Sequence, residues 1–563
     1  MKKKMLAVFI CLVMVAGLIP TVAFAAENEV DVWDGTSDTS WYNETDTEFH
    51  IKTAEQLAGL AELTNIGIDT GASTGNTFDN KIIYLDCDLD LGDYPWTPIT
   101  NRNGDDGYFF KGTFDGQGHT IYNLNRHGIG NDSFDSLFGY VQGGVIKNLN
   151  VVDADLSAND YSMHVGIIAA LVENGKIINC YTSGTVESVN GWRSIGGIAG
   201  SCMQGTQIVG CGSDANIISR KSESSDSVGG LVGEWLNANK TSVISDCWFN
   251  GSIVSEDPES TVGGLLAVGY NNNVEENVKI NNCMMVSSDL SSAEKEYTAV
   301  IAHLTGTPTV ADCFYKESDN GYHVITKLDK GSLAIDTSFD PTPCAKAITD
   351  FTDNDILVLL QNNASQGVVW VEGIEHPTFS WDLTNRLADY TAVDAAIARA
   401  TALDSSLYTN YSAVEDSINS VDRAKNKAQQ TEVDAMAKAI EDAITALQYK
   451  DADYTKVDAA IAKANALNKD DYKDFSGVET AVKAVVRGKN ITEQSEVDKM
   501  AKAIEDAIAA LEKKPASTKL GTSDKSPQTG DSSNLALCIA LLFISGGVAI
   551  GTTVVSRKKK YDR

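Results

Sequence analysis

The middle of the chain is dominated by short runs in which apolar and polar residues alternate. Such runs occur, for example, at 178–186, 244–254 and 280–290. A period of two places successive side chains on opposite faces of an extended backbone, which is typical of strands and not of helices. Glycine and asparagine separate the runs from about residue 80 to about residue 317. This region is therefore predicted to consist of many short β-strands joined by tight turns.

A repeat runs through the same region. Its clearest marker is a glycine motif that occurs at 195–200 (IGGIAG), 228–233 (VGGLVG) and 262–267 (VGGLLA). Periods between about 20 and 50 residues are typical of solenoids, and short strands with glycine turns favour a parallel β-helix. With the helical region described below, the sequence predicts a mainly β fold, in which a parallel β-helix (solenoid) head is followed by two three-helix bundles.

Cysteines recur with this repeat, mostly directly after Asn or Asp. The five that do so are Cys180, Cys211, Cys247, Cys283 and Cys313. The chain contains no C-x-x-C pair, which argues against a zinc ribbon. A free cysteine behaves as a small and usually buried hydrophobic residue. We therefore expect the five to share one rung position and to stack in a column inside the solenoid, and not to form disulfides.

The first two thirds of the chain resemble the GLUG repeat of bacterial surface proteins. The resemblance lies in the glycine motifs, in 110–121 (FKGTFDGQGHTI) and in the opening 51–57 (IKTAEQL), and it covers about 26–385. It implies a β-helix on the cell surface, of the kind seen in adhesin-like proteins, and no particular activity. Residues 53–65 are predicted to form an amphipathic helix that caps the first coil. We also predict a helix over 345–362 and closing strands at 368–371 and 379–381.

The pattern changes at about residue 387, where Ala, Asp and Lys become frequent. Residues 390–397 return as 454–461, and 438–444 return unchanged as 502–508. Each copy has three apolar stripes at helical spacing, which predicts two three-helix bundles at 388–450 and 452–514. Thr431 and Ser495 are expected to cap the third helices. The copies resemble FIVAR modules, which implies a spacer or a sugar- or protein-binding module, and 515–525 is predicted to be a flexible tether.

The two ends of the chain carry targeting signals. Residues 1–25 have a lysine-rich start, an apolar run and an Ala-Phe-Ala cleavage site, which predicts a secretory signal peptide. At the other end, an apolar run at 535–555 is long enough to span a bilayer and precedes a basic tail. Directly upstream lies the pentapeptide Ser526, Pro527, Gln528, Thr529 and Gly530.

This order of pentapeptide, span and basic tail resembles the sorting signal (526–563) of Gram-positive surface proteins. The resemblance implies that a sortase cuts between Thr529 and Gly530 and joins the Thr529 carbonyl to peptidoglycan. The family pattern usually begins with Leu where this chain has Ser526. The predicted location is therefore outside the cell, attached to the wall, with the membrane involved only through the tail before processing.

The formal net charge of −32 argues against nucleic acid as a partner, because a phosphate backbone repels such a surface. The best carboxylate group is Asp86, Asp88 and Asp90, in a run that alternates with Leu and Cys. If the strand is continuous, the three acids point outward on one face. Such a face could bind Ca²⁺, act as acid and base on a polysaccharide, or be a solvated strand face without a function. No cofactor is otherwise indicated.

Three functions fit these features. We favour a cell-wall-anchored adhesin that binds a host or environmental glycan or protein without catalysis, through many weak contacts along a repeated face. The alternative is a surface polysaccharide lyase or glycoside hydrolase that uses the Asp86 face. A passive spacer is the third. Trp192, Trp235 and Trp248 are candidates for stacking on sugar rings, although burial in the core explains them equally well.

Overall fold

The computed structural model describes residues 32–515, except for 67–74, 102–108, 128–133, 159–162, 190–192, 222–224, 238–241, 272–275, 306, 329–334 and 337. The described residues form two compact units. One contains residues up to 403 together with 411–446, and the other contains 404–410 together with the residues from 447 onward.

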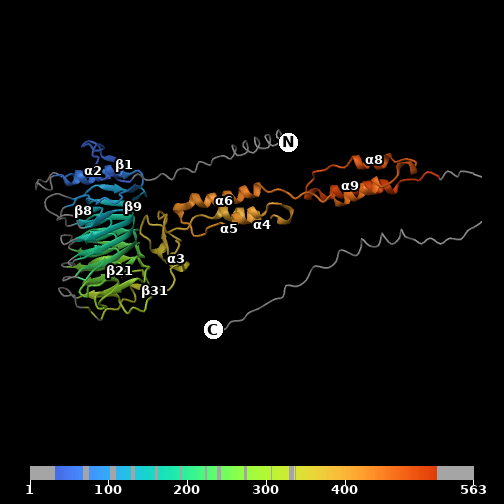
Figure 1. Cartoon of the computed structure of the whole chain (residues 1–563). Helices are drawn as coiled ribbons and strands as arrows, with labels where there is room; N and C mark the ends of the chain where they lie inside the picture. The colour runs from blue at the N-terminus through green and yellow to red at the C-terminus, as the bar shows by residue number, and fades with distance from the viewer. Residues whose placement is uncertain are drawn as a thin grey trace, which may run out of the picture. The chain divides into compact units, whose positions relative to one another are not determined.

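The first unit contains a parallel β-solenoid, as predicted, whose coils are stacked so that the chain runs from one end to the other (Figure 1). Within the described residues, two long sheets run along its axis. The larger, sheet A, consists of β1 (Glu48–Ile51), β2 (Ile82–Leu85), β3 (Leu89–Asp90), β4 (Thr113–Asp115), β5 (Thr120–Tyr122), β6 (Asn125–His127), β9 (Val145–Ala158), β12 (Lys176–Ser188), β15 (Gln207–Val209), β16 (Gly212–Ser219), β19 (Val243–Ser245), β20 (Trp248–Phe249), β21 (Ser252–Ser255), β24 (Glu276–Asn281), β25 (Met284–Met285), β26 (Leu290–Ser292), β28 (Thr307–Ala311), β29 (Cys313–Lys316) and β31 (Ala345–Ile348).

Sheet B consists of β7 (Phe134–Asp135), β8 (Phe138–Gln142), β10 (His164–Gly166), β11 (Ala169–Glu173), β13 (Ser194–Gly196), β14 (Ala199–Met203), β17 (Ser227–Gly229), β18 (Val232–Asn237), β22 (Thr261–Gly263), β23 (Leu266–Asn271), β27 (Thr298–Thr305) and β30 (His323–Leu328). The core lies between the two sheets. One column of it, in which each residue pairs with the next in parallel register, is Phe49, Ile83, Phe114, Ile146, Ile177, Ile208, Ile244, Ile280 and Val310.

The cysteine column is confirmed. All five repeated cysteines are free and buried, and each Sγ donates to the carbonyl two residues earlier, at 3.1–3.5 Å. Successive members are neighbours: the Cys211 amide lies 3.5 Å from the Cys247 sulfur. Burial raises the pKa of Cys180 and Cys247 well above the ordinary thiol value, so these side chains are protonated apolar fillers.

The glycine motif marks a bend in sheet B. The first motif glycine ends β13, β17 and β22, and the strand resumes three residues later as β14, β18 and β23. A Cβ on Gly229 would lie 1.8 Å from the Val232 carbonyl oxygen, and one on Gly263 would lie 1.9 Å from that of Leu266. The two arms of the bent strand therefore approach too closely for any side chain at this position.

The predicted capping helix is α2 (Ala54–Asn65). It begins at the N-cap Thr53, whose side chain accepts a hydrogen bond from the Gln56 amide, and it buries Leu57 and Leu60 completely against the solenoid core. The helix covers the apolar end of the first coil, which would otherwise be open to solvent.

The helix predicted over 345–362 is only partly correct. Residues Ala345–Ile348 form β31, which pairs with β29, and the helix α3 spans Asn354–Asn363. The open edge of β29 supplies backbone partners that outweigh the helix propensity of the two alanines. The N-cap Asp353, which accepts from the Asp355 amide, sets the start of α3.

Residues 349–382, here called the closing segment, follow β31. They contain α3 and a hairpin of β32 (Trp370–Val371) and β33 (Thr378–Phe379), which agrees with the predicted closing strands. The segment packs on the outer face of sheet A and shares a hydrophobic cluster with it, including Trp248, Met284 and Trp370.

Both helical repeats form three-helix bundles. The first consists of α4 (Thr391–Thr401), α5 (Ser412–Asn419) and α6 (Gln430–Thr445), and the second of α7 (Thr455–Asn465), α8 (Ser476–Lys483) and α9 (Gln494–Ala509). The core of the second bundle is built from the predicted stripes, among them Val457, Val478, Val497 and Ile504.

The predicted caps of the third helices are wrong. Thr431 and Ser495 lie inside α6 and α9, close to their first residues. The caps are Asn426 and Asn490, which form capping boxes at short 3₁₀-helices that lead into α6 and α9. In each repeat a 3₁₀ turn precedes the α-helix, so the capping residue lies on the N-terminal side of that turn.

Several predictions lie outside the described residues: the signal peptide 1–25, the tether beyond Pro515, the sorting signal 526–563 with its span 535–555, and Trp192. Within the part of the chain that the structure describes, no helix has the length and apolar character needed to cross a membrane.

Candidate functional site

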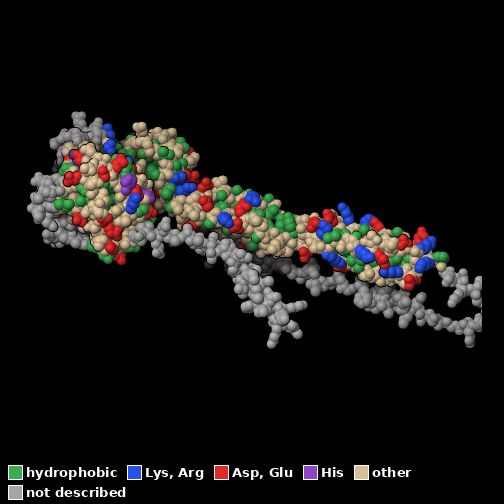
Figure 2. Space-filling model, turned by 90° about the horizontal axis from the view of Figure 1, so that it is seen from above, with side chains coloured by type: hydrophobic (Ala, Val, Ile, Leu, Met, Phe, Trp, Pro, Cys, Tyr) green, Lys and Arg blue, Asp and Glu red, His purple; other side chains and the backbone are tan. Residues whose placement is uncertain are grey.

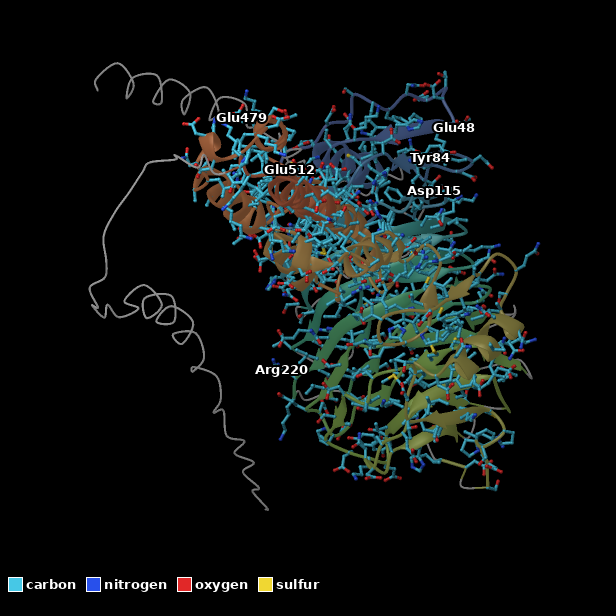
Figure 3. All side chains as sticks on the ribbon, turned by 90° about the vertical axis from the view of Figure 1, so that its right-hand side faces the viewer. Glu48, Tyr84, Asp115, Arg220, Glu479 and Glu512 are labelled. Carbon is cyan, nitrogen blue, oxygen red and sulfur yellow. The ribbon has the colours of Figure 1, made fainter. Side chains whose placement is uncertain are left out.

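The first coils of the solenoid present a polar and aromatic face on the outside of sheet A. The outward side chains of β1, β2 and β4 are in register, with His50 opposite Tyr84 and Tyr84 opposite Asp115. Figure 3 shows Glu48, Tyr84 and Asp115 one below another at the N-terminal end of the solenoid. We call seven residues of this face the polar strip: His50, Tyr84, Asp86, Asp88, Gln117, His119 and Tyr122.

The strand predicted through the three acids is interrupted. β2 ends at Leu85 and β3 begins at Leu89, so Asp86 and Asp88 lie in the turn between them, and only Asp90 lies in a strand. Cys87, which alternation predicted to be buried with the leucines, is only partly buried, and its Sγ lies 3.0 Å from the Lys52 carbonyl. The acids project toward the neighbouring coils because a turn, and not a flat strand, carries them.

Asp86 is held between the first and third coils. Nδ1 of His50 lies 2.8 Å from its Oδ1, Nε2 of Gln117 donates to the same oxygen at 3.1 Å, and the Lys52 ammonium is 3.8 Å from Oδ2. Burial raises the pKa of Asp86, but the hydrogen bond and charge of His50, the hydrogen bond from Gln117 and the charge of Lys52 together outweigh it, and the pKa lies below its ordinary value. Asp86 is therefore an ionised acceptor that orients the His50 ring.

The other two acids have partners of their own. Asp88 accepts from Nδ1 of His119 at 3.0 Å and from the Thr120 amide at 2.9 Å. Asp90 accepts from the Gly92 amide and from Nδ2 of Asn123, both at 2.8 Å. The three carboxylates are therefore separate anchors for cross-coil hydrogen bonds.

Two imidazole rings of the strip are thus fixed through Nδ1 by carboxylates of the second coil, which leaves Nε2 of each as the ring's remaining polar atom. The His50 side chain is 53% exposed and that of His119 is 34% exposed. Seen from the N-terminal end of the solenoid, histidine, lysine or arginine, and carboxylate side chains lie side by side on the head (Figure 2).

Aromatic rings complete the strip. The rings of His50 and Tyr84 are stacked, with centroids 5.2 Å apart and planes inclined by 25°. Tyr122 is half-buried beside the acids, and burial raises the pKa of its hydroxyl. Sequence reasoning missed the contribution of His50, Gln117 and His119. The available signal was spacing, because Gln117 and His119 follow Asp86 and Asp88 by 31 residues, about one repeat.

Farther along the solenoid, part of the same outer face is covered and largely apolar. One outward column begins with Thr120 and Asn150, and in parallel register it continues as Tyr181, Gly212, Trp248, Met284 and Phe314. Trp248 and Met284 are fully buried beneath the closing segment, and Trp235 is fully buried in the core. Trp235 and Trp248 therefore do not face solvent as sugar-stacking platforms.

Specific hydrogen bonds fix the closing segment in place. The buried carboxylate of Asp246 accepts from Nε1 of Trp370 and from the Ser365 amide, both at 3.1 Å. Asn282 donates through Nδ2 to the Leu360 carbonyl at 3.0 Å. The segment is thus an integral part of the fold. It covers part of the outer face of sheet A, and the polar strip lies on the first coils, outside that covered part.

The chemistry available on the strip is that of polar recognition. It offers carboxylate acceptors, an amide, two oriented imidazoles and aromatic rings on one open surface. Within the described residues, no group of three or more His, Cys, Asp or Glu side chains is arranged to hold a metal ion.

No family model matches this chain. Over 178 residues, or 30% of the chain, it is 30% identical to halomucin from Haloquadratum walsbyi. That match spans 2% of the length of halomucin.

Two solved structures are similar in fold. A candidate immunoglobulin A1 protease from Bacteroides ovatus is 21% identical, with a TM-score of 0.38, over 60% of this chain and 93% of that chain. An IgA1 protease is 14% identical, with a TM-score of 0.31, over 67% of this chain and 28% of that one. Both TM-scores are low, so neither likeness bears on what this chain does.

Proposed function

We propose that this chain is a surface-displayed binding protein without catalytic activity, whose solenoid binds a glycan, free or carried by a protein, through the polar strip. The observation that supports this proposal is the contrast along sheet A. The part of the outer face beneath the closing segment is largely apolar, whereas the first coils retain hydrogen-bonding and aromatic side chains on consecutive strands.

A carbohydrate suits such a surface for two reasons. Sugar hydroxyl groups pair with carboxylates, amides and imidazoles, and sugar C–H faces pack on aromatic rings. A polymer that lies along several coils makes one modest contact on each, and these contacts add up to useful affinity without a deep pocket.

The remainder of the chain fits display at a distance from the cell. We propose that a sortase links Thr529 to peptidoglycan, as the resemblance of 526–563 to a sorting signal implies, and that the GLUG-like head is the binding part. The two FIVAR-like bundles would serve as spacers. In the second bundle the core accounts for the apolar stripes, so those residues are not free for another role.

A glycan array probed with residues 26–529 tests the binding proposal. We expect specific binding that is weakened at least fivefold by Tyr84→Ala and by His119→Ala. The exposed Lys346, in β31 of the same solenoid, provides the matched control, and Lys346→Ala should bind like the parent protein. Absence of any glycan ligand, or equal binding by all three variants, would overturn the proposal.

A second candidate, a polysaccharide lyase or glycoside hydrolase, is favoured by one specific observation. The His50–Asp86 and His119–Asp88 pairs each hold an imidazole through Nδ1, as general bases commonly are held. A hydrolase also needs a carboxylic acid that stays protonated, and the lowered pKa of Asp86 makes that residue unsuitable for this role. Release of new reducing ends from a bound glycan, abolished by His50→Ala, would establish catalysis and replace the binding proposal.

A further inference from the structure

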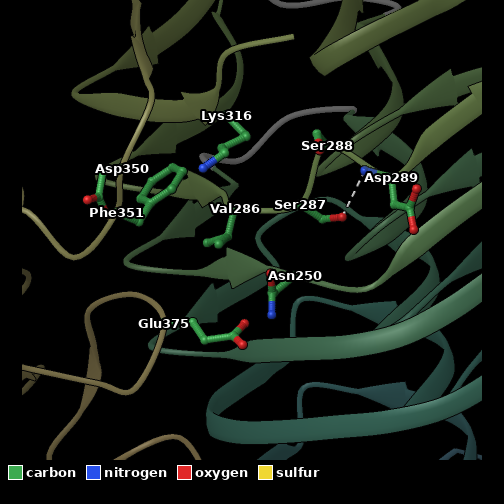
Figure 4. Close-up of a pocket in the computed structure, with 9 residues that line it drawn as sticks. All are labelled: Asn250, Val286, Ser287, Ser288, Asp289, Lys316, Asp350, Phe351 and Glu375. Carbon is green, nitrogen blue, oxygen red and sulfur yellow. Dashed lines mark hydrogen bonds between the residues drawn. The ribbon is translucent and has the colours of Figure 1, made fainter. Parts of the chain in front are cut away.

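A pocket with a volume of about 440 Å³ lies where the closing segment meets the last coils of sheet A. Its lining comes from four separate stretches of the chain: Asn250, Val286 to Asp289, Lys316, and the closing segment with Asp350, Phe351 and Glu375. Figure 4 shows Lys316 and Glu375 approaching from opposite sides, with Val286 and Asn250 between them. Pockets of this size are typical of small-molecule sites.

The charges in this pocket are not paired by direct contact with one another. The Lys316 ammonium donates to the Thr349 carbonyl at 2.6 Å, and among the described residues it has no carboxylate within ion-pair distance. Glu375 is exposed and, within the same described residues, makes neither a hydrogen bond nor an ion pair. By contrast, the Asp350 carboxylate accepts from the Thr352 amide and hydroxyl, at 2.8 and 2.7 Å.

The floor of the pocket combines an apolar patch with polar groups. Val286 and Phe351 are 8% and 3% exposed and belong to the cluster that anchors the closing segment. Asn250 provides an amide beside them and neighbours the partly buried carboxylate of Asp214. Oδ2 of Asp214 accepts from the Tyr181 hydroxyl at 2.7 Å, while Oδ1 has no hydrogen-bond partner among the described residues. Burial raises the pKa of the Asp214 carboxyl, so the negative potential of the site comes from the carboxylates that line it.

We propose that this pocket binds a sugar unit that carries a free ammonium group, such as a glucosamine residue of a polysaccharide. Glu375 accepts the ammonium, Lys316 donates to a hydroxyl or ring oxygen, and Asn250 with Ser287 binds further hydroxyls. The C–H face of the ring packs on Val286 and Phe351. Three carboxylates and one ammonium line the pocket, so it attracts a cationic ligand and repels an acidic sugar.

The proposal rests on the glycan-binding function and specifies one sugar class for a site distinct from the polar strip. Calorimetry of residues 26–529 with three tetrasaccharides tests it. They are the tetramers of glucosamine (the deacetylated tetramer), of N-acetylglucosamine and of glucose. Acetylation removes the charge and its hydrogen bonds, so the deacetylated tetramer should bind roughly tenfold more tightly than either of the others.

Glu375→Gln should abolish this preference by weakening the deacetylated tetramer roughly tenfold. Glu372→Gln, an exposed change in the same segment, should leave it unchanged, and matching melting temperatures exclude misfolding. Equal binding of the three tetramers, or an unchanged preference in Glu375→Gln, would overturn the amine site. If Tyr84→Ala still weakens binding of an array glycan in that case, only the pocket proposal has failed, whereas a complete lack of glycan binding would remove both.

Discussion

At the scale of single residues, the solenoid depends on the residue that precedes each cysteine of the column. Asn179, Asp246, Asn282 and Asp312 have φ values between 52° and 54°, and Gly210 has 64°. This left-handed conformation turns the chain at the same point of each coil, and among residues with a side chain Asn and Asp tolerate it best. The Asn-Cys and Asp-Cys pairs visible in the sequence are therefore a corner and its buried neighbour.

His303 illustrates a buried residue whose protonation state matters. In β27 it is 1% exposed, with Nε2 donating to the Val262 carbonyl at 3.0 Å and Nδ1 facing the Thr326 hydroxyl at 2.5 Å. Both contacts suit the neutral ring, and burial lowers the pKa of His303 to about 4.

Acid should therefore destabilise the solenoid through His303. The folded pKa lies below the unfolded value of about 6.5, so the unfolded chain binds more protons as the pH falls from about 6.5 to about 4. As the pH falls through that window, the free energy of unfolding decreases by up to about 3 kcal/mol. Melting temperatures measured across it should fall less steeply for His303→Gln than for the parent protein. The exposed Lys346→Gln in β31 is the control and should follow the parent curve; identical slopes for all three proteins would contradict this assignment.

At the scale of elements, the bend in sheet B explains why the repeat contains glycine. Gly229→Ala places a Cβ 1.8 Å from the Val232 carbonyl oxygen, so the two arms of the bend must separate. We expect a loss of about 3 kcal/mol or more, seen as a lower melting temperature of the solenoid.

The matched comparison is Gly477→Ala in α8, where an added Cβ meets nothing within 4 Å. There alanine should stabilise the second bundle by about 0.5–1 kcal/mol, because glycine is a poor helix former. A neutral Gly229→Ala variant would show that the bend tolerates a side chain and that the motif has another cause.

The elements also show what the sequence could and could not predict. The coils and the column of Cys180, Cys247 and Cys283 were predictable because each repeat carries the same local pattern. The turn at Asp86 was not, since the Leu-Asp alternation satisfies a strand equally well, and the turn is favoured by cross-coil bonds such as those to His50 and His119.

The pocket was beyond prediction for a related reason. Its lining joins Asn250 and Lys316 to Glu375, and only the fold of the closing segment brings these residues together. Likewise, nothing in the local sequence distinguishes Trp248, which the segment covers, from an exposed aromatic. Local patterns predict elements, whereas coverage of one element by another depends on tertiary packing.

At the scale of the whole molecule, the proposed attachment to the wall can be tested independently of ligand binding. Thr529→Ala changes the residue whose carbonyl the proposed sortase reaction transfers, while leaving 32–515 untouched. We expect the variant to disappear from the covalent wall fraction and to accumulate in membranes or medium, as measured by immunoblotting of muramidase-released protein. Ser523→Ala, a conservative change outside the pentapeptide, is the control and should leave anchoring intact.

Unchanged covalent attachment of Thr529→Ala would contradict the sorting signal. The proposed role of the head would remain testable in that case, since binding is assigned to the solenoid alone.

The central claim is that the polar strip on the first coils of sheet A contacts the ligand. Hydroxyl-radical footprinting of residues 26–529, with and without a glycan selected on the array, measures this directly. The account predicts that oxidation of His50, Tyr84, His119 and Tyr122 decreases in the complex, while the exposed His323 of sheet B and residues of the second bundle are unchanged. Protection confined to the bundles, or no protection of the polar strip by a bound glycan, would contradict it.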